Sequence, residues 1–206
     1  MRPLLDRAEY LLSVHTQAQL PPDRGVEIAI AGRSNAGKSS LINRVCRQKS
    51  LARTSRTPGR TRQLVFFRLD EQRHLVDLPG YGFARVSGDL QRHWQGLIHG
   101  YLSRRKALIG LIIVMDIRHP LKPGDIDLIN WAAARELGLH LVLTKADKLG
   151  RGKQKEALLR LRDTVDDSVG VQLFSATTGQ GREELEQAFA RWLLQPTARA
   201  GASPGQ

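Results

Sequence analysis

One short stretch constrains the fold of this 206-residue chain more than any other. Residues 32–39 match the phosphate-binding loop pattern G-x-x-x-x-G-K-[ST] at each fixed position. The apolar run at 26–31 is typical of a buried strand, and residues 40–45 are typical of a helix start. This context favours a P-loop over a chance glycine turn. We predict nucleotide contacts from Gly32, Arg33, Ser34, Asn35, Ala36, Gly37, Lys38, Ser39 and Ser40.

Each fixed position of this loop has a chemical task. Gly32 and Gly37 let the backbone curl so that successive N–H groups face one anion, and the following helix adds the positive end of its dipole. Lys38 can neutralise charge on the β- and γ-phosphates, and we assign it a catalytic role. The Ser39 hydroxyl can bind Mg²⁺.

Composition predicts one globular domain in a reducing compartment. Hydrophobic residues make up 41% of the chain, and the single cysteine, Cys46, cannot form an internal disulfide. The N-terminus shows no signal-peptide pattern, and the longest apolar run, at 107–115, is too short to span a bilayer. We therefore expect a cytoplasmic protein with no membrane partner.

The formal net charge of +12 favours a polyanionic partner, most simply a nucleic acid. Four arginines lie within residues 53–62, which suits contact with RNA, although a solvated face is the alternative for any single residue. A generally basic proteome would give the same composition.

Strands and helices alternate along most of the chain. We predict strands at 26–31, 64–69, 74–77, 109–115, 139–143 and 171–174, and helices at 40–45, 87–102, 123–137, 153–165 and 182–194. In the helix at 123–137, we expect Ile126 to face the protein core. This order predicts an α/β fold with three layers, in which a mostly parallel six-stranded sheet has one antiparallel edge strand. We expect an N-terminal extension at 1–24, one domain at 25–195 and a disordered tail at 196–206.

A second phosphate element follows the strand at 74–77. Asp77 lies 39 residues after Lys38 and can hold Mg²⁺ through water, while the Gly80 N–H can sense a γ-phosphate. Asp-x-x-Gly alone is a common turn, and its spacing from the P-loop is what favours the functional interpretation. The predicted nucleotide contacts here are Asp77, Leu78, Pro79 and Gly80.

Two further elements predict a guanine base. Asp147 can accept hydrogen bonds from guanine N1–H and its 2-amino group, a donor pair that adenine does not offer. The stem of Lys145 can cover the base, and the Ala176 N–H can meet guanine O6. The tetrapeptide at 144–147 alone would more often be a helix cap, and the tripeptide at 174–176 alone carries almost no information. The predicted contacts are Thr144, Lys145, Ala146, Asp147, Phe174, Ser175 and Ala176.

A polar segment before the strand at 64–69 can order around the nucleotide. Thr61 could complete the Mg²⁺ shell when a γ-phosphate is present, and we assign it and Gly80 catalytic roles. The alternative is a solvated, arginine-rich loop. The predicted contacts are Gly59, Arg60, Thr61, Arg62 and Gln63.

Together these motifs resemble the EngB-type (YihA/YsxC) ribosome-biogenesis GTPases, of the TrmE-Era-EngA-EngB-Septin-like superfamily. The resemblance runs from about Pro21 to Leu194, and its most specific parts are Thr144 in place of asparagine and the sequence Gly80-Tyr81-Gly82. It implies a single Ras-like G domain that acts in assembly of the large ribosomal subunit, with rRNA rather than DNA as partner. It also implies a role in cell division and septation. Nothing demands more than a monomer.

Two positions bear on hydrolysis. Tyr81 stands where familiar small GTPases place a water-orienting glutamine, which predicts slow intrinsic hydrolysis; Tyr81 either acts directly or only packs. The Asn35 side chain could bind K⁺ between phosphates, by resemblance, or cap its own loop. Two alternatives stay open: a GTP sensor without useful hydrolysis, and a P-loop kinase for a small molecule.

Overall fold

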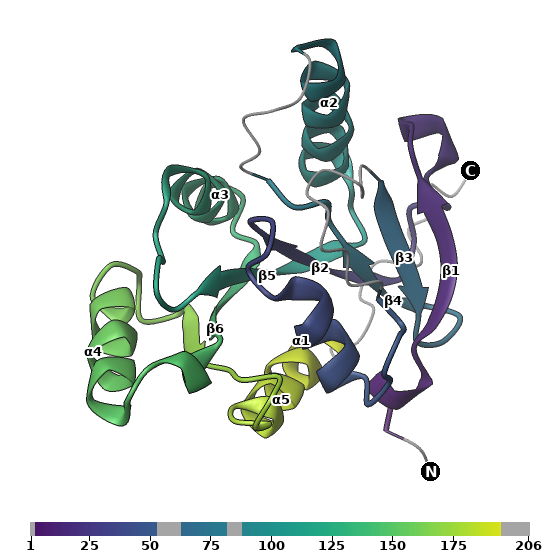
Figure 1. Ribbon diagram of the computed structural model, residues 1–206. Coiled ribbons are helices and arrows are strands. Elements are labelled where there is room, and N and C mark those ends of the chain that lie inside the picture. Colours follow the sequence, from purple (N-terminus) through teal and green to yellow (C-terminus); the bar gives the residue numbers. More distant parts are fainter. Residues whose placement is uncertain (1–2, 53–62, 82–87, 195–206) are drawn as a thin grey trace.

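A seven-stranded sheet forms the centre of the computed structural model, which describes residues 3–52, 63–81 and 88–194, with only the backbone for residues 88–95. The strand order is β1-β3-β4-β2-β5-β6-β7 (Figure 1). Its strands are β1 (Glu9–Val14), β2 (Val26–Gly32), β3 (Leu64–Arg68), β4 (Arg73–Asp77), β5 (Leu108–Asp116), β6 (Gly138–Thr144) and β7 (Gly170–Leu173).

The α/β class is confirmed, but the expected number of six strands is wrong by one. The extra strand, β1, comes from residues expected to form an extension, and it pairs antiparallel with β3. β3 therefore has antiparallel partners on both sides, while β4, β2, β5, β6 and β7 run parallel. Residues 9–14 escaped prediction because they alternate poorly and are mostly exposed or half-buried, as befits a strand at the sheet edge.

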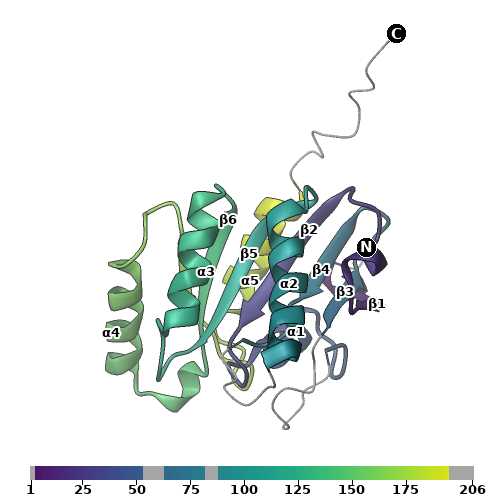
Figure 2. The same cartoon turned by 90° about the horizontal axis from the view of Figure 1, so that it is seen from above.

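Helices cover both faces of the sheet (Figures 1 and 2). The long helices are α1 (Lys38–Val45), α2 (Gly88–Arg104), α3 (Pro123–Ala134), α4 (Arg151–Arg162) and α5 (Arg182–Leu193). Short 3₁₀ turns lie at Leu5–Arg7, Gln17–Gln19 and Ala146–Lys148. Apolar side chains of α1 and α5 share one core with the sheet, and those of α2, α3 and α4 share the other. The predicted three layers are thus present.

The buried face of α3 differs from the face that its sequence indicated. Ile126 is 43% exposed, so the expectation that it faces the core is wrong. Ala132 is fully buried instead, and Ile129 packs at the margin of the core. The apolar stripe is therefore rotated relative to the predicted one.

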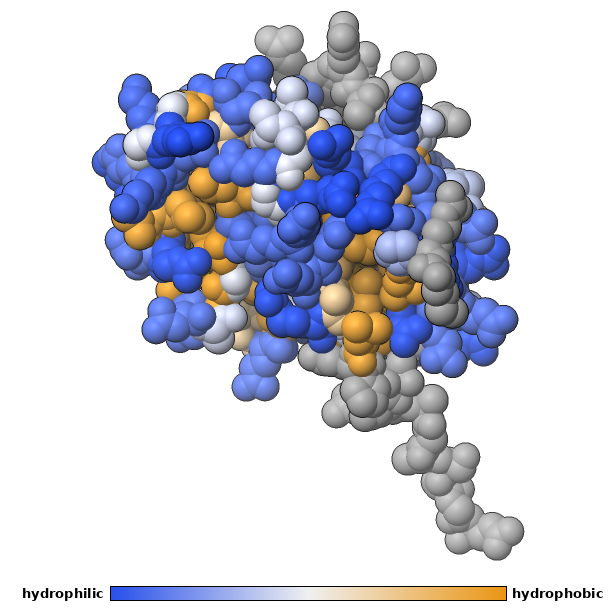
Figure 3. Space-filling model, turned by 90° about the horizontal axis from the view of Figure 1, so that it is seen from below, coloured by the Kyte–Doolittle hydropathy of each residue, from blue (hydrophilic) through white to orange (hydrophobic). Residues whose placement is uncertain are grey.

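The surface seen in Figure 3 is mainly hydrophilic, with apolar residues in smaller areas between hydrophilic ones. Within the described ranges, no helix is both long enough and apolar enough to cross a membrane.

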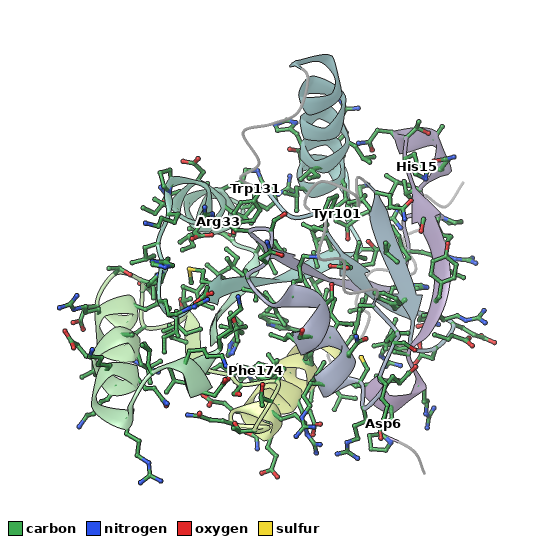
Figure 4. All side chains as sticks on the ribbon, in the orientation of Figure 1. Asp6, His15, Arg33, Tyr101, Trp131 and Phe174 are labelled. Carbon is green, nitrogen blue, oxygen red and sulfur yellow. The ribbon has the colours of Figure 1, made fainter. Side chains whose placement is uncertain are left out.

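A buried charge network fixes the beginning of β2 far from the loops that follow the strands. Glu27 is fully buried, and it accepts hydrogen bonds from the Tyr101 hydroxyl (2.9 Å) and from Nε of Arg105 (3.0 Å to Oε2). Tyr101 reaches it from α2 (Figure 4). Arg105 also donates to the carbonyls of Pro21 (2.7 Å) and Pro22 (3.1 Å). The network ties the end of α2 to the segment before β2.

Candidate nucleotide-binding site

The predicted site residues gather at the carboxyl ends of the parallel strands. The P-loop follows β2, Leu78 follows β4, Lys145 follows β6 and Phe174 follows β7. Because these strands are parallel neighbours, their loops meet at one edge of the sheet, which is where open α/β sheets bind ligands. The sequence motifs, which are far apart in the chain, therefore form one site.

Within this site the P-loop has the curled backbone that its glycines predict. Gly37 has a φ of 96° and caps α1, and Asn35 has a φ of 64°. No carbonyl in the described part of the chain accepts the N–H groups of Asn35, Gly37, Lys38 and Ser39. Unpaired amides at a helix start form an anion site, so this backbone can bind phosphate.

Close packing leaves no room for a side chain at Gly32 or at Gly80. A Cβ on Gly32 would lie 2.6 Å from the carbonyl oxygen of Val114 on β5. A Cβ on Gly80 would lie 2.6 Å from Oγ of Ser34. The loop after β4 thus packs directly on the P-loop, so a movement at Gly80 would displace residues of the P-loop.

Lys38 and Asp77 form an ion pair at the centre of the site. Asp77 is 6% exposed, and burial raises the pKa of its carboxyl while the Lys38 ammonium opposes that rise. A buried carboxylate with one cationic partner has hydrogen-bond capacity left. The pair places the predicted phosphate ligand and the predicted metal ligand side by side.

Tyr81 is joined to the P-loop through its backbone and to α3 through its side chain. Its N–H donates to the Gly32 carbonyl (3.3 Å), and its carbonyl accepts the Ser34 N–H (3.2 Å). Its hydroxyl donates to Oδ1 of Asp125 (2.7 Å), and burial together with that carboxylate raises the pKa of Tyr81. Of the two interpretations of Tyr81, this geometry favours packing over orientation of water.

The loop after β6 is tied to the P-loop at two points. The Thr144 hydroxyl donates to the Ala36 carbonyl and lies 3.0 Å from the carbonyl oxygen of Met115. Nζ of Lys145 donates to the Asn35 carbonyl (2.6 Å). The predicted base-binding and phosphate-binding segments are therefore parts of one hydrogen-bonded unit.

Asp147 is held in place by a serine from the next loop. The Ser175 hydroxyl donates to Oδ1 of Asp147 (2.6 Å), and Nζ of Lys148 lies 3.3 Å from Oδ2. These contacts lower the pKa of Asp147. The backbone joins the same loops, since the Ala146 N–H donates to the Phe174 carbonyl (3.1 Å). An oriented, ionised carboxylate suits recognition of two N–H donors on a guanine edge.

Comparison with known proteins assigns the family. A family described as 50S ribosome-binding GTPase matches residues 27–145. The "Probable GTP-binding protein EngB" of Xanthomonas campestris is 53% identical over 204 residues, covering 96% of this chain and 99% of the relative. The protein of the same name from Stenotrophomonas maltophilia is 53% identical over 194 residues, or 92% and 97% of the two chains.

The chain belongs to the EngB family of GTP-binding proteins. Solved structures agree on the fold. A probable EngB crystal structure matches with a TM-score of 0.67 at 22% identity, covering 83% of this chain and all of that one. Aquifex aeolicus Era bound to GDP and aluminium fluoride matches with a TM-score of 0.67 at 20% identity, covering 88% and 62%.

The oxygen donors of this EngB chain fit a magnesium ion. Ser39 is the second residue of α1 and directly follows Lys38 of the Lys38–Asp77 pair, and hard oxygen ligands such as its hydroxyl are those that Mg²⁺ prefers. No group of three or more His, Cys, Asp or Glu residues suited to a metal occurs among the described residues. A magnesium ion here would take its other ligands from phosphate and water, as in nucleotide sites.

Some predicted contacts of this EngB chain lie outside the described residues, namely Gly59, Arg60, Thr61 and Arg62. Gln63 is described, and it lies half-buried immediately before β3. Asp116, whose carboxylate lies 2.9 Å from Nζ of Lys145, was not among the predicted site residues. Its signal was an acidic residue directly after the buried run of β5, in register with Thr144.

Proposed function

We propose that this EngB-family protein hydrolyses GTP slowly and acts as a GTP-dependent switch in assembly of the large ribosomal subunit, in the cytoplasm. Normal cell division and septation would depend on that role. The observation that carries the proposal is the meeting of unpaired loop amides, the Lys38–Asp77 pair and the oriented Asp147 at one sheet edge. The match to 50S ribosome-binding GTPases supports the choice of partner.

The phosphates would bind at the P-loop. The amides of residues 35 and 37–39 would surround them, and Lys38 would move from Asp77 to the β- and γ-phosphates. Ser39, Asp77 and Thr61 would hold Mg²⁺, which neutralises charge on the phosphates when bound. Gly80 would sense the γ-phosphate through its N–H, and its contact with Ser34 supports coupling to the loop.

Hydrolysis would be slow because no amide side chain follows Gly80. Tyr81 turns its hydroxyl to Asp125 and offers nothing to an attacking water. The ribosomal partner, or K⁺ bound near Asn35, would supply the acceleration. The same orientation of Tyr81 favours a second candidate, a GTP sensor without significant hydrolysis.

The partner would be rRNA, because the net charge is +12 and phosphate contacts dominate binding to nucleic acids. We propose a monomer with no membrane and no DNA partner. Such a contact would weaken steeply as salt rises, since each neutralised phosphate releases counterions.

Two measurements test the proposal. The purified protein is sedimented with large ribosomal subunits in GDP and in a non-hydrolysable GTP analogue, at two salt concentrations. Tighter, salt-sensitive binding with the analogue is expected, and equal binding in both states would contradict a nucleotide-gated contact.

Phosphate release is then measured with and without subunits, in KCl and in NaCl. Release that stays negligible in all conditions would favour the sensor, and equal rates in both salts would remove the role of K⁺.

A further inference from the structure

We propose that Asp116 is a positioning residue for Lys145, and that with Arg118 it sets guanine-nucleotide affinity by holding that lysine in its binding position. The inference rests on the predicted role of Lys145 against the base. It adds two residues that belong to none of the nucleotide motifs. Asp116 ends the buried strand β5 and Arg118 follows it, beside the neighbouring strand β6, which ends at Thr144 immediately before Lys145.

Lys145 is held from two sides. Its Nζ donates to the Asn35 carbonyl at 2.6 Å and lies 2.9 Å from Oδ2 of Asp116. Its backbone is in the left-handed region, with a φ of 58°, and its side chain is 30% exposed. The stem therefore runs along the site between two fixed points rather than into solvent.

Asp116 is a rigid anchor for this contact. It ends β5 directly opposite Thr144 in the parallel ladder, and the Ile117 N–H donates to the Thr144 carbonyl at 3.1 Å. Its carboxylate is 16% exposed. A carboxylate at the end of a central strand can fix a lysine more tightly than one on a loop.

Arg118 fixes the carboxylate of Asp116. Its Nε donates to Oδ1 at 2.9 Å, its Nη2 to Oδ2 at 2.7 Å, and its backbone N–H to Oδ1 at 3.1 Å. Partial burial would raise the pKa of Asp116, but the hydrogen bonds from Arg118 and Lys145 outweigh it and lower that pKa. The carboxylate is thus ionised and oriented, with Oδ2 shared between the two cations.

The contact between Asp116 and Lys145 has two opposite effects on nucleotide affinity, and the two can be measured separately. A free lysine side chain loses rotamer freedom when it is ordered against a ligand, and a lysine that is already held loses less. The negative charge of Asp116, however, disfavours an anionic nucleotide nearby. Positioning and bulk electrostatics therefore predict opposite signs for removal of this charge.

The test is the affinity and dissociation rate of a fluorescent GDP analogue in the Asp116→Asn variant. Both carboxylate oxygens accept from cationic donors, so an amide of the same size must turn its NH₂ group toward one of them. We expect about tenfold weaker binding, mostly through faster dissociation. The matched control is Asp127→Asn, which removes the same charge from an exposed position of α3 and should change affinity less than twofold. Equal or tighter binding in Asp116→Asn would overturn the proposal.

A double-mutant cycle shows whether Asp116 acts through Lys145. In a Lys145→Met background, which keeps an apolar stem without its ammonium, Asp116→Asn should have no further effect on affinity. A full tenfold effect in that background would contradict positioning. If Asp116→Asn fails to fold, Arg118→Ala serves instead, with an expected loss of about threefold that also vanishes beside Lys145→Met. Failure of the wild-type protein to bind GDP would instead count against the proposed function.

Discussion

The hydroxyl of Tyr81 donates a hydrogen bond to Oδ1 of Asp125 at 2.7 Å, joining the loop after β4 to the first turn of α3. Asp125 is 1% exposed, and its Oδ2 accepts the Lys122 N–H at 2.9 Å. The ring of Tyr81 also fills the space beside Gly124, where a Cβ would lie 3.0 Å from Cδ2. This side chain serves the contact between loop and helix.

The Tyr81→Phe variant should therefore lose stability and keep its intrinsic GTP hydrolysis. A buried carboxylate that loses a donor costs about 1–3 kcal/mol in the free energy of unfolding. Chemical denaturation measures that loss, and phosphate release measures turnover. Tyr10→Phe is the control, since Tyr10 is 59% exposed and its hydroxyl donates to Oγ of Ser13 (3.1 Å), another surface residue of β1. A large drop in turnover at unchanged stability would show that the Tyr81 hydroxyl acts in catalysis.

The Asp147→Asn variant should exchange guanine for xanthine. An amide offers a donor where guanine also has one, so GDP affinity should fall about 100-fold or more, while xanthosine diphosphate, with a carbonyl at that position, should gain affinity. Ser175→Ala, which removes the donor at 2.6 Å, should weaken GDP binding less and leave base choice unchanged. Asp163→Asn, on an exposed residue, is the charge control. Unchanged base preference in Asp147→Asn would place the base elsewhere.

The Thr144→Val variant tests the contact between the β6 loop and the P-loop. Thr144 is 3% exposed, and loss of its hydroxyl leaves the Ala36 carbonyl without that donor. The free energy of unfolding should fall by about 1–3 kcal/mol, with weaker nucleotide binding because the loop is less restrained. Denaturation and titration with a fluorescent nucleotide measure both effects. Thr178→Val is the comparison, since it removes an exposed hydroxyl that accepts the Gln180 N–H at 3.3 Å, and it should change both quantities much less. A stable variant with wild-type affinity would disprove the coupling.

Stability should fall as the pH drops from 7 to 5. Burial lowers the pKa of His140, aided by the charge of Arg191, and the hydrogen bond to Gln172 (2.7 Å) only partly opposes it. Burial likewise lowers the pKa of His74. Both histidines therefore stay neutral in the folded protein at a pH where they already bind protons in the unfolded chain, in which the pKa of histidine is about 6.5.

Stability is then lost as the pH falls through the unfolded pKa, by at most about 1.4 kcal/mol per pH unit for each histidine. Denaturation midpoints measured between pH 5 and 8 test this slope. His140→Gln should flatten it, whereas His99→Gln, at an exposed position, should not. An unchanged slope in His140→Gln would mean that other groups bind these protons.

The parts of the fold that could be read from the sequence are those with strong local signals. The P-loop and the buried strands combine glycine spacing with continuous apolar runs, and they lie where predicted. β1 was missed because an edge strand needs no apolar alternation on its open side. Ile126 was misplaced because the position of the apolar stripe on α3 depends on the angle at which the helix meets the sheet.

The candidate site likewise has contacts that follow from the sequence and contacts that do not. Spacing and strand order bring Lys38, Asp77 and Asp147 to one edge, so their proximity follows from the sequence. The hydrogen bond of Tyr81 to Asp125 and the ion pair of Lys145 with Asp116 do not follow from the sequence. Each joins a loop residue to a neighbouring helix or strand, and tertiary packing sets how close the two lie. Single charged residues beside a strand carry no pattern that distinguishes them from solvated ones.

The anchor at the end of α2 has a mechanical consequence. Arg105 is fixed to Glu27 and to the carbonyls of residues 21 and 22, and the Ala107 N–H donates to Asp23 at 2.8 Å. The last turn of α2 cannot slide along the sheet without breaking this buried network. A displacement imposed at the first turn of α2 would therefore rotate the helix about its anchored last turn. A partner lying along α2 would therefore meet larger displacements at its first turn than at its anchored last turn.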